Sequence, residues 1–327
     1  MNKSRIKKNA LALIFGSHLC FTGSPAEAQK VYYIGSLNTA EQFVSSFEGF
    51  KSRMAELGYI EGRSVRYDFY NAKGDNEALN SFARKMVQDK VDLIVTSATT
   101  STVAAAKATQ GTNIPVVFLS SGNAQILVKS FASSGSNLAG ISSASLELTG
   151  KRFELLKEMA PWVQRLALIT DPTGVNYKSI ATEVGEAAKK IKFTVWEVKV
   201  STREEVLKVV PTVTRKTTDA VFTPPDSFVT EAMEIIVKHS IKEKLPVITS
   251  LVDNVKKGCL ATYAADYFAL GQQGAILADK IFKGIKPSDL PIELPFKLKL
   301  VINLKTAKAI GLKVPKDILL RADEVIE

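Results

Sequence analysis

Residues 93–119 read LIVTSATTSTVAAAKATQGTNIPVVFL, and this stretch contains two short apolar runs with a helix-forming segment between them. Leu93–Thr96 and Val116–Leu119 have the composition of buried strands. Thr100–Ala108 carries apolar residues at three- and four-residue spacing, which is typical of a helix. A strand, a helix and a strand in this order build a parallel sheet. The stretch therefore predicts an α/β fold.

The same alternation extends in both directions from this stretch. Before it, we predict strands Val31–Leu37 and Val65–Tyr70 and helices Glu41–Leu57 and Asn76–Gln88. After Gly140-Ile141-Ser142 the pattern restarts, which predicts a second sheet domain and a division near residue 143. The elements predicted there are helix Leu146–Met159, strand Arg165–Ile169, helix Asn176–Lys190, strand Thr194–Lys199, helix Arg203–Val210, strand Ala220–Phe222, helix Ser227–His239 and strand Val247–Thr249.

Residues 1–28 have the three parts of a secretory signal peptide. Four basic residues lie within the first eight positions, Ala10–Phe21 is apolar, and Ala26-Glu27-Ala28 fits an A-x-A cleavage site. The apolar run is well short of the roughly 20 residues that a membrane-spanning helix needs. Cys20 follows Ser17-His18-Leu19 rather than the small residue usual in a lipidation signal. We therefore predict a periplasmic protein, cleaved near Ala28 and without a lipid anchor.

Cleavage would leave 299 residues and lower the formal net charge from +10 to +7. The remaining basic residues form only short groups such as Lys189-Lys190 and Lys256-Lys257, so we expect no nucleic-acid partner. Cys259 would be the only cysteine, which excludes an internal disulfide, and its apolar neighbours predict a place in the core.

Motifs of catalysis and cofactor binding are absent from the sequence. It contains no G-x-S-x-G, no phosphate-binding G-x-x-x-x-G-K-[ST] and no G-x-G-x-x-G after a strand. Gly150-Lys151 resembles the end of a phosphate loop, but Ser145 stands where its first glycine would be. His239 is the only histidine after residue 28, and we expect it to serve at a helix end. We therefore expect no enzyme, metal or cofactor, with an exported α/β enzyme acting on a small molecule as the alternative.

Polar loops follow the predicted strands in both halves. Parallel sheets bind ligands beyond the carboxyl ends of their strands, where helix N-termini also offer free N–H groups. Hydroxyl and amide residues also cap helices, so each of them has a structural alternative. The candidate ligand-binding residues are Ser36, Asn38, Ser97, Thr99, Thr100, Ser121, Asn123, Asn176, Asp226, Ser250, Asp253 and Tyr263.

Four segments resemble a known family: Gly58-Tyr59-Ile60-Glu61-Gly62-Arg63, residues 104–118, Lys286-Pro287-Ser288-Asp289-Leu290-Pro291, and the closing run from Leu300 to Glu327. They are similar to the substrate-binding proteins of ABC importers, in the family that includes tryptophan- and tyrosine-binding members. The resemblance covers residues 30–327. It implies a type I periplasmic binding protein fold, with two Rossmann-like lobes, parallel central sheets, three crossover segments and one ligand in the cleft.

The resemblance also implies where the lobes divide and how they act. Residues 29–143 with 263–291 would form the N-terminal lobe, and 144–262 with 292–327 the C-terminal lobe. The crossovers would lie near Ile141–Ser143, Tyr263–Asp266 and Pro291–Pro295. Such a protein, expected to be a monomer, closes by hinge motion on a small organic solute and delivers it to a membrane permease. An amino acid or a related carboxylate-bearing compound is the expected ligand.

The resemblance assigns a role to some individual residues of this chain. Asn176 and Asp226 match positions that contact ligand in the family. Asp226 would suit an ammonium group, while the loop Ser97–Thr100 would suit a carboxylate. Asp226 is equally suited to cap the following helix. Relatives commonly carry Asp-Pro after the strand that ends near Phe118, but this chain has Ser121-Gly122-Asn123-Ala124 and lacks that carboxylate.

Overall fold

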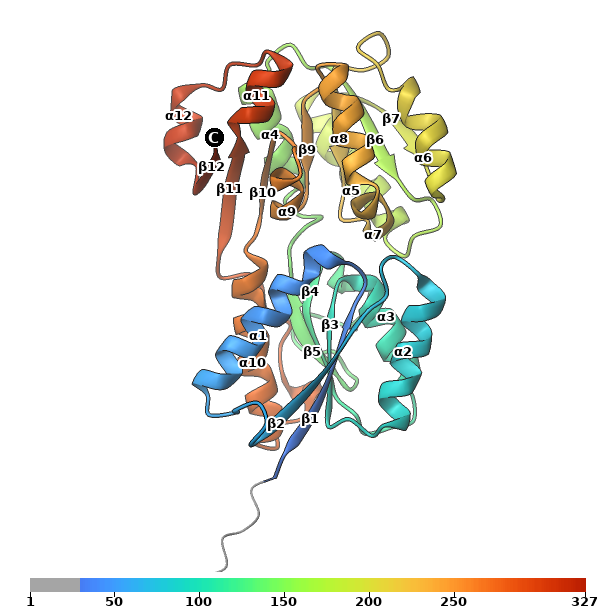
Figure 1. Cartoon of the computed structure of the whole chain (residues 1–327), viewed down its shortest axis with the longest axis vertical. Helices are drawn as coiled ribbons and strands as arrows, with labels where there is room; N and C mark the ends of the chain where they lie inside the picture. The colour runs from blue at the N-terminus through green and yellow to red at the C-terminus, as the bar shows by residue number, and fades with distance from the viewer. Residues whose placement is uncertain (1–29) are drawn as a thin grey trace, which may run out of the picture. The chain divides into compact units, whose positions relative to one another are not determined.

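Two β-sheets form the framework of residues 30–327, the part of the chain that this computed structural model describes (Figure 1). The predicted signal peptide lies outside these residues. The first sheet has the order β2-β1-β3-β4-β5, and all its neighbouring strands are parallel. The strands are β1 Tyr32–Asn38, β2 Val65–Asn71, β3 Leu93–Ser97, β4 Val116–Ser121 and β5 Leu138–Ser142.

Helices cover both faces of this sheet, which explains why β3, β4 and β5 are buried along their whole length. One face packs against α1 (Val44–Glu56, preceded by the 3-10 turn Glu41–Phe43) and α10 (Tyr267–Phe282). The other face packs against α2 (Asn76–Gln88) and α3 (Thr99–Ala108). Helix α2 has the predicted bounds.

Helix α10 lies beside α1, although more than 200 residues separate them in the sequence (Figure 1). The two helices meet at glycines. A Cβ atom on Gly271 would lie 1.8 Å from the carbonyl oxygen of Ser46, and one on Gly49 would lie 2.0 Å from that of Phe268. Neither position accepts a side chain without moving a helix backbone, so glycine is what allows this close packing.

The second sheet has the order β12-β11-β10-β9-β8-β6-β7. Its neighbouring strands are parallel except β10 and β11, which are antiparallel. The strands are β6 Arg165–Thr170, β7 Thr194–Lys199, β8 Ala220–Thr223, β9 Val247–Thr249, β10 Ala261–Ala265, β11 Leu298–Asn303 and β12 Glu324–Ile326. The helices are α4 Thr149–Met159, α5 Tyr177–Ile191, α6 Arg203–Val209, α7 Ser227–Glu231, α8 Met233–Lys242, α9 Val252–Lys256, α11 Leu304–Ile310 and α12 Lys316–Arg321.

Two helix predictions were wrong in detail, and one helix was not predicted. The helix predicted from Leu146 begins at Thr149, because the preceding residues form a turn. The single helix predicted for 227–239 is divided at Ala232 into α7 and α8. Helix α9 occupies part of a segment predicted as a loop. It is only one turn long, and so short an element leaves no periodic pattern in the sequence.

The chain passes between the two sheets three times, as the predicted fold class requires. It leaves β5 for α4, leaves β10 for α10 through Asp266 alone, and returns from α10 to β11. The third passage lies beside the first, because the Ser142 N–H donates to the carbonyl oxygen of Glu293 at 2.9 Å. Asp266 accepts a hydrogen bond from the α10 backbone and forms an ion pair with Lys299 at 3.0 Å. The exact lobe boundaries stay a prediction.

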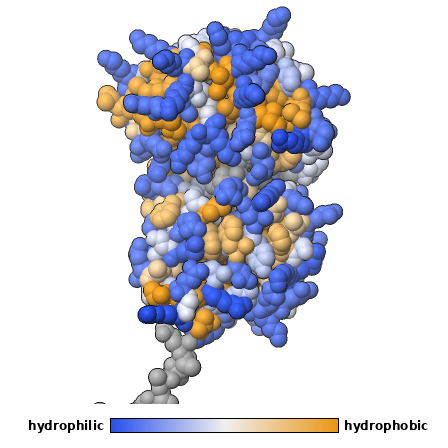
Figure 2. Space-filling view, viewed as in Figure 1, coloured by the Kyte–Doolittle hydropathy of each residue, from blue (hydrophilic) through white to orange (hydrophobic). Residues whose placement is uncertain are grey.

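Cys259 and His239 occupy structural positions, as predicted. Cys259 is buried in the core against Met233, and burial raises the pKa of its thiol. The His239 ring lies 2.8 Å from the carbonyl oxygen of Val213 in the last turn of α8. Figure 2 shows a mainly hydrophilic surface on one side, with apolar side chains in small groups. None of the helices in residues 30–327 is long and apolar enough to cross a membrane.

Candidate functional site

The carboxyl ends of strands from the two sheets meet across a narrow gap. The Asn123 side-chain amide, after β4, donates to the hydroxyl of Ser179 in α5 at 2.9 Å. A Cβ atom on Gly122 would lie 3.1 Å from Cβ of Pro225, in the loop after β8. The polar loops predicted to bind a ligand therefore face one another in this structure.

In the first lobe, the predicted hydroxyl groups already bond to one another. The Ser46 hydroxyl donates to a main-chain carbonyl, so the Ser97 hydroxyl, 2.6 Å away, donates its proton to Ser46. The Thr99 and Ser121 hydroxyls lie 3.0 Å apart, and the Asn123 N–H donates to both oxygens. Only one of these two hydroxyls can donate to the other. The Thr99–Ser121 pair therefore retains one proton for a ligand, whereas Ser97 has none to spare.

Buried oxygen atoms without a hydrogen-bond partner gather at the same strand ends. Asn38 donates to Ser36 at 2.9 Å, but its Oδ1 atom has no partner among residues 30–327. Leaving a buried polar group unpaired costs about 1–3 kcal/mol, so such a group calls for an explanation. A ligand between the strand ends would supply partners. In the described part of the chain, the buried side-chain oxygens without a hydrogen-bond partner at these strand ends belong to Asn38, Thr39, Ser120, Asn176, Thr223 and Ser250.

Asp226 has two roles in the structure. Its Oδ1 atom accepts from the Val229 N–H at 3.1 Å and so caps α7, while Oδ2 accepts from the Asp171 N–H at 2.8 Å and the Thr170 hydroxyl at 3.4 Å. Burial raises the pKa of the Asp226 carboxyl, against the opposite effect of the Asp171 and Val229 N–H groups. The carboxylate also lines a cavity, so capping and ligand binding do not exclude each other.

This cavity, of about 200 Å³, lies between the two lobes. Thr100, at the start of α3, lines it from the first lobe, and the acidic residues Asp171 and Asp226 line it from the second. Apolar side chains, including Val175 and Phe228, form part of its wall. The cavity is smaller than the range of about 300–1,000 Å³ usual for drug-sized ligands, and it therefore suits a small solute.

The remaining predicted residues lie elsewhere. Asn123 lines a separate cavity of about 230 Å³. Asp253 lines one of about 150 Å³ and forms an ion pair with Lys256 at 3.6 Å. Asn176 donates to the carbonyl oxygen of Pro225 at 3.3 Å. Tyr263 lines a fourth cavity, of about 530 Å³, that none of the other predicted residues lines. The structure therefore does not bring Tyr263 together with the other candidates.

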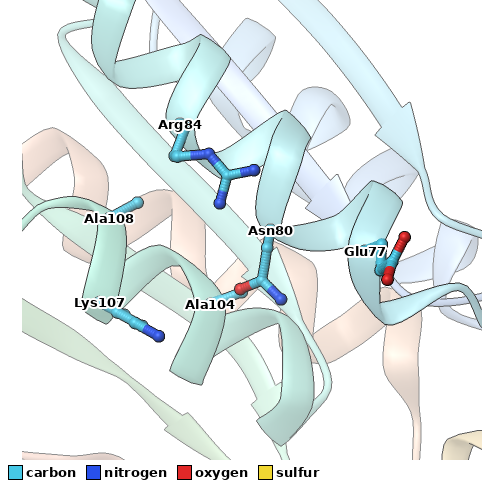
Figure 3. A pocket seen from close by; sticks show the side chains of 6 residues that line it. All are labelled: Glu77, Asn80, Arg84, Ala104, Lys107 and Ala108. Atoms are coloured by element: carbon cyan, nitrogen blue, oxygen red, sulfur yellow. The ribbon is translucent and has the colours of Figure 1, made fainter.

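A larger cavity, of about 550 Å³, lies between α2 and α3 and is shown in Figure 3. Glu77, Asn80 and Arg84 line it from α2, and Lys107 lines it from α3. All its lining residues belong to these two helices, and none lies in a loop after a strand. Its size alone does not make it the functional site, because ligands of parallel sheets bind at the strand ends.

Arg152 was missed by the sequence analysis. Its side chain is 0 % exposed, and it lies on the same face of α4 as the buried residues Thr149 and Leu156. This spacing of three and four residues was readable in the sequence. Arginine is almost never fully buried, so it was not considered a core residue.

Two sheets with facing strand ends, three passages of the chain between them and a small cavity lined by both lobes define a type I periplasmic binding protein fold. Comparison with known families agrees with this class. The chain belongs to the family of ABC transporter substrate binding proteins, whose family model matches residues 40–326. The resemblance found in the sequence is thereby confirmed.

Three relatives place the chain within this family. It is 31% identical over 267 residues to the tyrosine-binding protein of Clostridioides difficile (strain R20291), covering 81% of this chain and 76% of that protein. A crystal structure of an ABC domain in complex with L-Trp from Streptococcus pneumonia superposes with a TM-score of 0.83 at 27% identity, covering 91% of this chain and 100% of the other. A ligand-free, open structure of a substrate binding protein with adhesive properties from Clostridium difficile has a TM-score of 0.66 at 29% identity, covering 90% and 99%. The better match to the complex agrees with the contacts between the strand ends.

Proposed function

We propose that this substrate-binding protein captures an amino acid or a closely related zwitterion between its lobes and passes it to the permease of an ABC importer. It acts as a monomer in the periplasm, after cleavage near Ala28, and catalyses no reaction. The observation that carries the proposal is the cavity between the lobes, whose lining includes two acidic residues and several apolar ones.

The ammonium group of the ligand would lie near Asp171 and Asp226. The raised pKa of the Asp226 carboxyl reflects the cost of burying its charge, and a neighbouring cation would offset that cost. The apolar side chains of Val175 and Phe228 would pack against the hydrocarbon part of the ligand. Relatives described as tyrosine-binding or bound to L-Trp support a ligand of this class.

Closure would follow from contacts made to both lobes at once. A ligand stabilises the closed form only to the extent that it binds that form more tightly than the open one. Thr100 and the unpaired oxygen of Asn38 belong to the first lobe, while Asp226 and Ser250 belong to the second. A ligand that contacts all four would therefore bind the closed form preferentially.

Titration calorimetry with unmodified protein tests the proposal. L-tyrosine, L-tryptophan and L-leucine are compared with their deaminated analogues, which keep the carboxylate and the side chain. We expect at least one amino acid to bind, and its analogue to bind about 30-fold more weakly or worse, because a buried carboxylate loses its partner. Equal binding of both would remove the ammonium site. Mass spectrometry of the ligand after incubation should find it unchanged.

Changing the ligand is a cleaner test than replacing Asp226. An asparagine there would keep one acceptor oxygen, whereas the carboxylate accepts main-chain N–H groups through both of its oxygens. The Asp226→Asn protein would therefore lose stability as well as affinity. An asparagine could still cap α7 through the Val229 N–H, but it would lose the bond from the Asp171 N–H.

A further inference from the structure

Arg152 is a buried cation that the protein itself leaves incompletely paired. Its Nη1 atom donates to the carbonyl oxygen of Ser145 at 2.5 Å, but Nε and Nη2 have no partner within residues 30–327. Burial lowers the pKa of the guanidinium to about 10, so it remains charged at neutral pH. A charge that is removed from water and left without an anion is strongly destabilising.

No carboxyl group of the described chain compensates this charge by direct contact. Tyr267 and Glu147 are the ionisable groups that act on the guanidinium. Burial raises the pKa of Tyr267, so its hydroxyl is neutral. Glu147 is exposed to solvent and makes no hydrogen bond to Arg152 among those found in residues 30–327. The anion that would pair with Arg152 would therefore come from outside the protein.

A continuous series of contacts leads from Arg152 to the first lobe. Tyr267 interacts electrostatically with Arg152, and its hydroxyl lies close to the side chain of Ser143. The N–H and hydroxyl of Ser143 donate to the carbonyl oxygen of Ser121 at 2.8 and 3.2 Å. Ser121 in turn pairs with Thr99, and this pair holds the spare hydroxyl proton. The series therefore leads from the guanidinium on α4 to the adjacent ends of β4 and β5 in the first sheet, where the spare proton lies.

The loop that carries Asp226 reaches the same part of the first lobe. A Cβ atom on Gly122 would lie 3.6 Å from Cβ of Ser145, which accepts from Arg152, and 3.1 Å from Cβ of Pro225, which precedes Asp226. Gly122 thus lies beside the residue whose carbonyl oxygen accepts from Arg152 and beside the residue that precedes Asp226. An α-amino acid carries its carboxylate and its ammonium on the same carbon, so it needs two opposite charges in such proximity.

We propose that Arg152, with the Thr99–Ser121 hydroxyl pair, receives the carboxylate of the ligand. This inference rests on the proposed function and assigns the anionic end of the same ligand. The planar guanidinium can present Nε and Nη2 together to two carboxylate oxygens. The guanidinium is fully buried and donates to Ser145 in this structure, so the carboxylate reaches it while the lobes are apart and is enclosed when they close.

The test compares amino acids with amines that lack only the carboxylate: L-tyrosine with tyramine, and L-tryptophan with tryptamine. Calorimetry is performed on the wild-type protein and on Arg152→Met, which has a side chain of similar length without donors. We expect Arg152→Met to bind the amino acid about 30-fold more weakly, while its affinity for the amine stays unchanged. In Arg152→Met, the ratio of the affinity for the amino acid to the affinity for the amine should therefore fall towards one. Arg84→Met, in an exposed part of α2, serves as the matched control and should preserve the ratio.

Thermal unfolding separates this role from a structural one. Removing a buried, unpaired cation should leave the melting temperature of the empty protein unchanged or raise it. A lower melting temperature with the wild-type ratio of affinities would overturn the inference and leave the proposed function standing. Failure of the wild-type protein to bind either amino acid would refute both. If Arg152→Met does not fold, Arg152→Lys decides, because it keeps the charge but loses the planar pair of donors, and an unchanged ratio would then refute the inference.

Discussion

Gly122 lies where the two lobes come together, and Gly122→Val should impair closure specifically. A Cβ atom there would lie 3.1 Å from Cβ of Pro225, which follows β8 of the second sheet, and 3.6 Å from Cβ of Ser145, which lies between β5 and α4. Gly122 is not among the residues with positive φ, so a side chain brings no backbone strain. The whole penalty should therefore arise in the closed form.

The magnitude follows from the space available. An alanine Cβ at 3.1 Å requires its neighbour to move by only a few tenths of an ångström. The methyl groups of valine extend further, and overpacking of this kind typically costs about 1–3 kcal/mol. Because 1.4 kcal/mol corresponds to a factor of ten, the dissociation constant of the Gly122→Val protein should rise about 5- to 150-fold. Gly122→Ala should change it less than Gly122→Val does.

Calorimetry with an amino acid that binds the wild-type protein measures this effect, and small-angle scattering measures compaction. The melting temperature of the empty Gly122→Val protein should match that of the wild type, because the open form does not make the contact. Wild-type affinity together with wild-type compaction would refute the reasoning, since it would mean that Gly122 and Pro225 do not meet in the bound state.

Three further substitutions test other parts of the structure. Thr99→Ala removes half of the hydroxyl pair and should weaken amino-acid binding by about 0.5–1.5 kcal/mol in calorimetry, whereas a purely structural hydroxyl would lower only the melting temperature. Burial alone would raise the pKa of Asp266, but the hydrogen bond and charge of Lys299 outweigh it and hold the pKa below its usual value. That stabilisation is present above the pKa of the unfolded chain and is lost as the pH falls, so the unfolding free energies of wild type and Asp266→Asn should converge in acid, as urea titrations at several pH values would reveal. Gly271→Ala would place a Cβ atom 1.8 Å from a main-chain oxygen and should cost about 1–3 kcal/mol or more in urea unfolding; an unchanged midpoint would show that α1 and α10 separate easily.

Local patterns decided which elements could be predicted. Helix α2 was found with its correct bounds because it is amphipathic over 13 residues and because Asp75 caps it through the N–H groups of Glu77 and Ala78. Helix α9 has five residues and one turn, too few for a period to appear. The two parallel sheets were predicted from the alternation of strands and helices together with the family resemblance.

The candidate site was less accessible to sequence reasoning, because hydrogen-bond partners are set by the tertiary fold. The hydroxyl of Ser97 is used by Ser46, which is 51 residues away in the sequence. Tyr263 was predicted near a crossover, but it lies in the middle of β10 and lines a different cavity. Arg152 stands on a buried helix face, where a cation contradicts the usual composition of a core. The sequence indicated which loops form the candidate site, but it did not indicate which of their side chains are already hydrogen-bonded within the protein.

The position of α10 determines when the first lobe can become stable as the chain is synthesised. Leu270 and Leu277 of this helix pack in the same core as Ile34 of β1 and Leu93 of β3. Until the chain has been synthesised past Phe282, one face of the first sheet lacks this cover and exposes its apolar side chains. The N-terminal 266 residues alone would therefore be expected to aggregate rather than fold, and the nascent chain should stay unfolded for most of its synthesis.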